Sequence, residues 1–232
     1  MSDGMKSLGV LFGGLALAAC ASAHAPAAAP AAEFAQWEPE IAAFEAADRA
    51  NPPAPGGVVF AGSSSIRMWD SLSADFPGLN VLNRGFGGSQ TADLAHFADR
   101  IVIPYRPRLV VVYEGDNDLM AGKSPQRVLA DYEALVREIH RALPRTRIAY
   151  ISIKPSPSRW ELATEMREAN ALIRAYSATD PRLAYIDVFD AMLGPDGRPR
   201  PEIFRDDELH MNRRGYEIWR SIVAPYLRPA AP

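Results

Sequence analysis

The stretch Val58-Val59-Phe60-Ala61-Gly62-Ser63-Ser64-Ser65 joins a short apolar run to a glycine and three consecutive serines. An apolar run without polar alternation is typical of a strand that is buried on both faces. The serines begin where the run ends, so we expect them at the carboxyl end of that strand. In open parallel sheets, this end of the strands is where ligands bind.

Further apolar runs of the same kind follow along the chain, at residues 79–82, 109–113, 148–153 and 183–186. The spacing of apolar positions predicts helices over residues 37–50, 89–103, 125–143, 160–178 and 213–227. Alternating strands and helices imply right-handed crossovers between parallel strands. The sequence therefore predicts one α/β domain, a three-layer α/β/α sandwich around a parallel five-stranded sheet.

Composition excludes several classes of function. The chain has 232 residues and a net charge of −3 without a basic stripe, which argues against nucleic-acid binding. Its one cysteine, Cys20, lies near the N-terminus, so the domain that follows has neither a disulfide nor a cysteine-based metal site. The four histidines are far apart in sequence, which disfavours a metal centre: His24, His96, His140 and His210.

The N-terminus has the pattern of an export signal, with Lys6 ahead of an apolar run that is too short for a membrane-spanning helix. Leu17-Ala18-Ala19-Cys20 resembles a bacterial lipobox, which predicts that Cys20 is lipidated and that the lipid is the membrane anchor. The alternative is cleavage after Ala23-His24-Ala25 and simple secretion. We expect a signal peptide over residues 1–20, an Ala/Pro-rich tether over 21–36 and the folded domain over 37–232, in the bacterial cell envelope.

Reactive residue types follow the predicted strands. Asp207 and His210 are separated by the spacing that places both side chains on one face of a turn. The carboxylate can then orient the imidazole, which can take the proton of a serine hydroxyl. We therefore predict a catalytic triad in which Ser64 is the nucleophile, His210 the general base and Asp207 the residue that orients the base.

Acyl transfer also needs donors for a developing oxyanion. The sequence offers three such groups: the backbone N–H of Ser64, the backbone N–H of Gly88 and the side-chain amide of Asn117. The first two belong to glycine- or serine-rich turns after strands, and Asn117 follows the apolar run that ends at Tyr113.

These motifs resemble the SGNH (GDSL-like) hydrolase family. Residues 60–66 resemble its first block, Gly88 its second, Gly115-Asp116-Asn117-Asp118 its third and Asp207-Glu208-Leu209-His210 its last. The resemblance implies a flavodoxin-like sheet, ester hydrolysis through an acyl-enzyme intermediate, and neither a metal nor an organic cofactor. Ser63 replaces the family's usual aspartate before the nucleophile, and Ser65 remains the alternative nucleophile.

The substrate is less defined by sequence. The family and the export signal favour small-molecule or carbohydrate esters with short acyl groups, with O-acetyl groups on carbohydrates as one candidate. A lysophospholipase or thioesterase using the same site, and a non-catalytic glycan-binding lipoprotein, are the alternatives. Arg159 and Trp160, in a loop after the fourth strand, are candidates for substrate binding, although Trp160 could instead anchor the next helix. Oligomeric state is not indicated by any pattern.

Overall fold

The computed structural model describes Met1 and residues 34–228. Its centre is a five-stranded parallel sheet in the order β2-β1-β3-β4-β5. This architecture confirms the predicted flavodoxin-like α/β fold. The strands are β1 (Val58–Gly62), β2 (Val81–Gly85), β3 (Leu109–Tyr113), β4 (Arg147–Ile151) and β5 (Leu183–Ile186).

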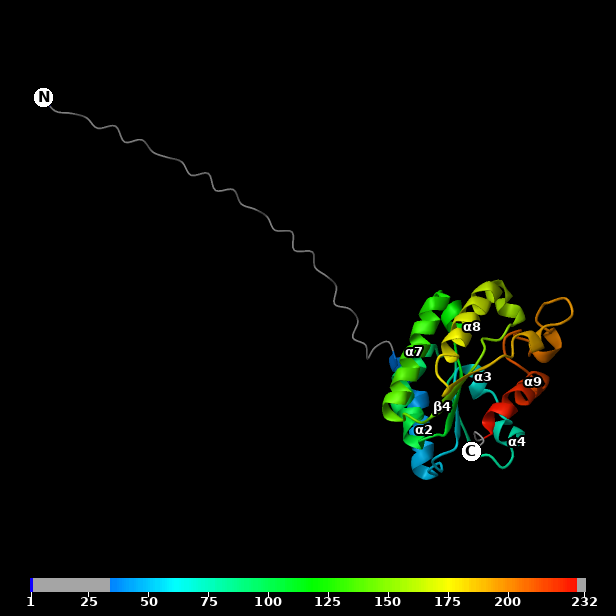
Figure 1. The fold of residues 1–232 in the computed structure, drawn as a ribbon, viewed down its shortest axis with the longest axis horizontal. Helices are drawn as coiled ribbons and strands as arrows, with labels where there is room; N and C mark the ends of the chain where they lie inside the picture. Colours follow the sequence, from blue (N-terminus) through cyan, green and yellow to red (C-terminus); the bar gives the residue numbers. More distant parts are fainter. Residues whose placement is uncertain (2–33, 229–232) are drawn as a thin grey trace.

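Helices cover both faces of the sheet. Figure 1 shows α2, α7 and α8 on one side and α3, α4 and α9 on the other, which gives the three layers. None of the described helices is both long and apolar enough to cross a membrane. The α-helices are α2 (Glu38–Ala50), α3 (Ser64–Arg67), α4 (Leu72–Asp75), α5 (Thr91–Ile101), α6 (Asp116–Met120), α7 (Pro125–Ala142), α8 (Ala163–Ser177) and α9 (Arg213–Val223). The 3-10 helices are η1 (Ala35–Trp37), η2 (Ile103–Tyr105), η3 (Pro157–Leu162), η4 (Asp190–Met192), η5 (Pro201–Ile203) and η6 (Ala224–Leu227).

The core is divided by the sheet into two apolar clusters. Successive side chains of a strand point to opposite faces, and β1 shows this directly. Val59 and Ala61 pack in the cluster that contains α5, α7 and α8. Val58 and Phe60 pack in the cluster that contains α3, α4 and α9. Because both faces of the strand are buried, its sequence is a continuous apolar run.

Strand β2 differs from the prediction, which placed a strand at residues 79–82. It runs through Asn83 and Arg84 to Gly85, in register with β1. Arg84 is buried in the strand because it forms an ion pair with Asp48 and donates from Nε to the Tyr105 hydroxyl at 2.8 Å. A charged residue in a strand has no sequence signature when its partners come from distant helices.

The packed part of the chain begins inside the segment assigned to the tether. The ring of Phe34 stacks on that of His96, with centroids 3.9 Å apart. Cys20, the proposed signal peptide and residues 21–33 of the proposed tether lie outside the described residues.

Asp75 ties the end of α4 to the start of α9. Its carboxylate accepts hydrogen bonds from Trp69 Nε1 at 2.7 Å and from Arg213 Nη2 at 2.7 Å, and its side chain is 2% exposed. Burial opposes its ionisation, but these donors and the hydroxyl of Ser71 outweigh burial and lower the pKa of Asp75 to about 2. The pair fixes the helix that begins three residues after His210 against the layer that contains α3.

We expect Asp75→Asn to lower the free energy of unfolding by about 2 kcal/mol at pH 7, and Tm by about 4–8 °C. The folded-state pKa lies below the ordinary value of 3.8. The carboxylate therefore stabilises the protein above about pH 4, and this contribution is lost as the pH falls toward 2. Chemical denaturation from pH 7 down to the lowest pH at which the protein folds measures the difference. The difference in unfolding free energy between wild type and Asp75→Asn should become smaller as the pH falls. The exposed Asp70→Asn variant should unfold with the same free energy as wild type. An equal loss in both variants would contradict the assignment.

Candidate active site

Ser64 lies at the junction between β1 and α3, as its place after the apolar run predicts. It is the first residue of α3 and is partly exposed, whereas Ser63 and Ser65 are 1% and 2% exposed. Gly62 makes this junction possible, because its φ is +140° and a Cβ there would lie 2.0 Å from the carbonyl oxygen of Tyr113. The strand can therefore turn into the helix without a clash, and of the three serines Ser64 is the one presented at the surface.

His210 is hydrogen-bonded on both sides of its ring. Its Nε2 lies 2.9 Å from Ser64 Oγ, and its Nδ1 lies 2.7 Å from Asp207 Oδ2. The other carboxylate oxygen of Asp207 accepts from the backbone N–H groups of His210 at 2.8 Å and Leu209 at 3.0 Å. The structure thus brings together the three residues predicted for the triad, although they are up to 146 positions apart in sequence.

Asp207 is ionised at neutral pH. Partial desolvation opposes ionisation, but hydrogen bonds from the His210 ring and from two backbone N–H groups lower the pKa of Asp207 to about 2. A carboxylate on Nδ1 holds the proton of the neutral ring there and leaves Nε2 as an acceptor toward Ser64. The arrangement can therefore move a proton from Ser64 Oγ to His210 Nε2.

The predicted oxyanion donors lie at the same edge of the sheet. Gly88 follows β2 in a turn that is joined to the end of β1 by a hydrogen bond of 2.9 Å from the Phe86 N–H to the Gly62 carbonyl. Gly88 is exposed and has a φ of +82°, a conformation that favours glycine. Among the described residues, the backbone N–H groups of Gly88 and Ser64 have no hydrogen-bond acceptor. Both are free to bind a ligand oxygen.

Asp116, Asn117 and Asp118 are consecutive but contact different partners. The Asp116 carboxylate lies 3.3 Å from Lys154 Nζ and 3.2 Å from Arg159 Nη1. Asn117 donates from Nδ2 to the Ser89 carbonyl at 2.9 Å. Asp118 is buried and accepts from the Thr91 N–H at 3.1 Å, which caps the first turn of α5. Only Asn117 of the three is partly exposed toward solvent.

A buried acid supports the turn that carries Gly88. Glu114 is fully buried, and its Oε1 lies 2.7 Å from Ser89 Oγ. Ser89 Oγ is also 3.0 Å from the carbonyl oxygen of Phe86. Burial, reinforced by the charge of Asp118, raises the pKa of Glu114 well above its usual range, which favours the neutral acid. Ser89 therefore holds the turn closed, and its carbonyl oxygen is the one that accepts from Asn117.

Arg159 and Trp160 were candidates for substrate binding. Arg159 Nη2 donates to Asn117 Oδ1 at 2.9 Å, and the Arg159 side chain is mostly buried. Trp160 is partly buried and packs on the larger apolar cluster. Arg159 thus lies against a candidate oxyanion donor, and the contacts of Trp160 are those of a packing residue.

The sequence interpretation missed Glu114, Asp116 and Lys154. Lys154 is 1% exposed and its ammonium contacts Asp116. One signal was present for all three, because each is a charged residue within a few positions of the end of a largely apolar strand. A charge at such a position is expected to be buried and paired.

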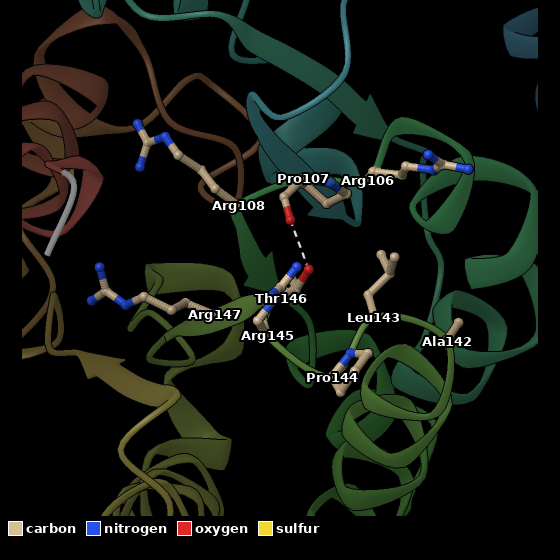
Figure 2. Close-up of a pocket in the computed structure, with 9 residues that line it drawn as sticks. All are labelled: Arg106, Pro107, Arg108, Ala142, Leu143, Pro144, Arg145, Thr146 and Arg147. Atoms are coloured by element: carbon tan, nitrogen blue, oxygen red, sulfur yellow. Dashed lines mark hydrogen bonds between the residues drawn. The ribbon is translucent and has the colours of Figure 1, made fainter.

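A large pocket lies at the opposite edge of the sheet from Ser64. It has a volume of about 780 Å³ and is formed by the segments that lead into β3 and β4 (Figure 2). Its lining includes the arginines at positions 106, 108, 145 and 147, and Thr146 Oγ1 donates to the Pro107 carbonyl at 2.7 Å across it. It is thus separate from the serine and histidine. Within residues 34–228, no group of three or more His, Cys, Asp or Glu side chains is arranged to bind a metal ion.

Comparison with known proteins adds an independent observation. A model of the GDSL-like lipase/acylhydrolase family matches residues 53–218, which include Ser64, Gly88, Asn117, Asp207 and His210. Human platelet-activating factor acetylhydrolase IB subunit alpha1 is 28% identical over 168 residues, covering 68% of this chain and 70% of the human protein.

Solved structures show the same fold. A GDSL-like lipase from Bacteroides thetaiotaomicron has a TM-score of 0.67 at 21% identity and covers 84% of this chain and 97% of its own. A family 3 carbohydrate esterase from Talaromyces cellulolyticus has a TM-score of 0.58 at 18% identity. The match covers 74% of this chain and 96% of the esterase. At these low sequence identities, the two similarities show a shared fold.

Proposed function

This chain belongs to the GDSL-like lipase/acylhydrolase family and is an ester hydrolase, and on that premise we propose that it is a serine esterase with a Ser64–His210–Asp207 triad. One observation carries the proposal. The partly exposed Ser64 Oγ lies 2.9 Å from His210 Nε2, and the opposite ring nitrogen lies 2.7 Å from the ionised Asp207. A binding site has no need of a nucleophile and a base matched in this way.

Acylation begins when Ser64 Oγ attacks the carbonyl carbon of the ester. His210 Nε2 takes the hydroxyl proton as the new C–O bond forms, and Asp207 stabilises the imidazolium. The carbonyl oxygen becomes an oxyanion, for which the N–H groups of Ser64 and Gly88 and the amide of Asn117 are the proposed donors. His210 then gives the proton to the leaving alcohol as the ester C–O bond breaks.

Deacylation repeats these steps with water. His210 takes a proton from the water as its oxygen attacks the acyl carbon, and the same donors hold the second oxyanion. Collapse of that intermediate breaks the bond to Ser64 Oγ, which recovers its proton from His210. The products are the carboxylic acid and free enzyme, so no further reactant is required.

We propose short-chain esters as the substrates, with acetyl groups on carbohydrates as the leading candidate. The human relative is named as an acetylhydrolase and the Talaromyces cellulolyticus structure as a carbohydrate esterase, which supports a small acyl group and a polar alcohol. Gly88 is exposed, and Ser64 and His210 are partly exposed, so an acyl group on a bulky alcohol can reach them. A lysophospholipase or thioesterase with the same site is the alternative.

Hydrolysis of a p-nitrophenyl ester series by the purified protein tests the proposal. We expect kcat/KM to be highest for acetate or butyrate and to fall with longer chains. A fluorophosphonate should inactivate the enzyme and add its phosphonyl group to Ser64, located by mass spectrometry of the labelled peptide. Preference for long chains would favour the lysophospholipase. Absence of both turnover and labelling would favour a binding protein and refute the proposal.

A further inference from the structure

A buried group of three charged side chains lies behind Asn117. Lys154 Nζ and Arg159 Nη1 lie 3.3 Å and 3.2 Å from the same oxygen of Asp116, and all three side chains are mostly buried. Burial of charge is costly unless the charges are paired and hydrogen-bonded. Two basic side chains therefore share one carboxylate beside a group proposed to bind an oxyanion.

The guanidinium of Arg159 reaches Asp116 and Asn117 at once. Nη1 forms an ion pair with the Asp116 carboxylate at 3.2 Å without a hydrogen bond, and Nη2 donates to Asn117 Oδ1 at 2.9 Å. At the other end of the amide, Asn117 Nδ2 donates one hydrogen to the Ser89 carbonyl at 2.9 Å. An amide nitrogen carries two hydrogens. Both ends of the amide are therefore fixed, and its second N–H is left for a ligand.

We propose that Arg159 is a positioning residue, which Asp116 holds in place so that it orients and polarises the Asn117 amide as an oxyanion donor, while Lys154 also pairs with Asp116. The inference rests on the proposed function, in which Asn117 serves that role. A cation that donates to the amide oxygen draws electron density from the nitrogen and strengthens the N–H as a donor. A lysine cannot replace the arginine, because only the planar fork contacts both partners.

The 3-10 helix η3, which contains Arg159, also contacts the turn that carries His210. The backbone N–H of Ser158 donates to the Glu208 carbonyl at 3.2 Å, and its hydroxyl donates to the same oxygen at 3.1 Å. Glu208 has a φ of +55°, so this turn has a backbone conformation that favours glycine. Ser158 and Arg159, which are adjacent in η3, thus connect the turn that carries His210 to Asn117.

The rival interpretation is that Arg159 binds the substrate directly. The two interpretations differ in the kinetic constant that changes. A positioning residue acts through Asn117 in the transition state, so its loss lowers kcat and has no effect once Asn117 is gone. A substrate contact raises KM whether or not Asn117 is present.

A double-mutant cycle on the full-length protein tests the inference with p-nitrophenyl acetate. We expect Arg159→Met to lower kcat by about 10- to 100-fold with KM within about twofold, and Arg159→Lys to recover little. Asn117→Ala should lower kcat by about 10²- to 10³-fold. The double variant should be no slower than Asn117→Ala alone. The proposal would be overturned if the kcat loss of the double variant equalled the product of the two single losses. It would also be overturned if Arg159→Met raised KM in the Asn117→Ala background.

Controls separate folding from catalysis and this inference from the function on which it rests. Titration with a fluorophosphonate counts the reactive sites, so kcat is expressed per competent molecule even if Arg159→Met folds less completely. Arg167→Met is the matched control, since Arg167 lies on α8 over the ring of Phe189 and should leave kcat and KM unchanged. If Ser64→Ala retains turnover, the proposed function itself fails. If Ser64→Ala is inactive and the cycle is additive, only the role of Arg159 fails.

Discussion

Ser64→Ala is expected to lower kcat for p-nitrophenyl acetate by about 10⁴- to 10⁶-fold while the protein folds normally. The alanine removes the only oxygen that lies within hydrogen-bond distance of His210 Nε2 among the described residues. Without it, no acyl-enzyme forms, and the residual rate comes from water held by His210 near the oxyanion donors. Stability should change little, because Ser64 is partly exposed and belongs to neither apolar cluster.

The flanking serines supply the matched controls. Ser63 and Ser65 are adjacent in sequence and equal in chemistry, but both residues are buried, and the hydrogen bond to His210 Nε2 comes from Ser64. Ser63→Ala and Ser65→Ala should therefore keep kcat within a few-fold of wild type. Stopped assays at high enzyme concentration make the very low turnover expected of Ser64→Ala measurable. Loss of turnover in Ser65→Ala with retention in Ser64→Ala would move the nucleophile by one residue.

The parts of the site that the sequence predicts are those encoded by neighbouring residues. Ser64 could be placed because it lies two residues after Gly62, which ends an apolar run, and a parallel sheet brings strand ends to one edge. Asp207 and His210 could be paired because their spacing closes a turn, and the carboxylate does accept from the ring and from the backbone N–H groups of Leu209 and His210. Such features depend on the geometry of a few consecutive residues, which a sequence pattern can predict.

The parts that the sequence did not predict depend on contacts between distant segments. Lys154 and Asp116 are 38 positions apart, and Arg159 and Asn117 are 42 apart. Arg84 lies within a strand only because Asp48, 36 positions away, neutralises it. No periodic pattern in the sequence indicates which distant residue pairs with a charged side chain. The sequence interpretation therefore placed Arg84 in a loop and left Arg159 facing the substrate.

Asp207→Asn is expected to lower kcat by about 10⁴-fold, although the change replaces a single atom. Asp207 Oδ1 accepts from the backbone N–H groups of Leu209 and His210, at 3.0 Å and 2.8 Å. An amide must keep its oxygen on that side, so its NH₂ group faces His210 Nδ1. The ring then accepts at Nδ1 and carries its proton on Nε2, where it cannot take the proton of Ser64.

Asp207→Ala should lower kcat less than Asp207→Asn does. This order is unexpected, because asparagine is the more conservative replacement. The Asp207 side chain is 47% exposed, so water can enter the space left by alanine and accept from Nδ1. The correct tautomer then remains accessible, and we expect a loss of about 10- to 100-fold, as for a misaligned base. Measurements of kcat for both variants at one pH test this order, with mass spectrometry excluding deamidation of the asparagine back to aspartate. If Asp207→Ala is the slower variant, the negative charge of Asp207, and not its control of the tautomer, is what His210 requires.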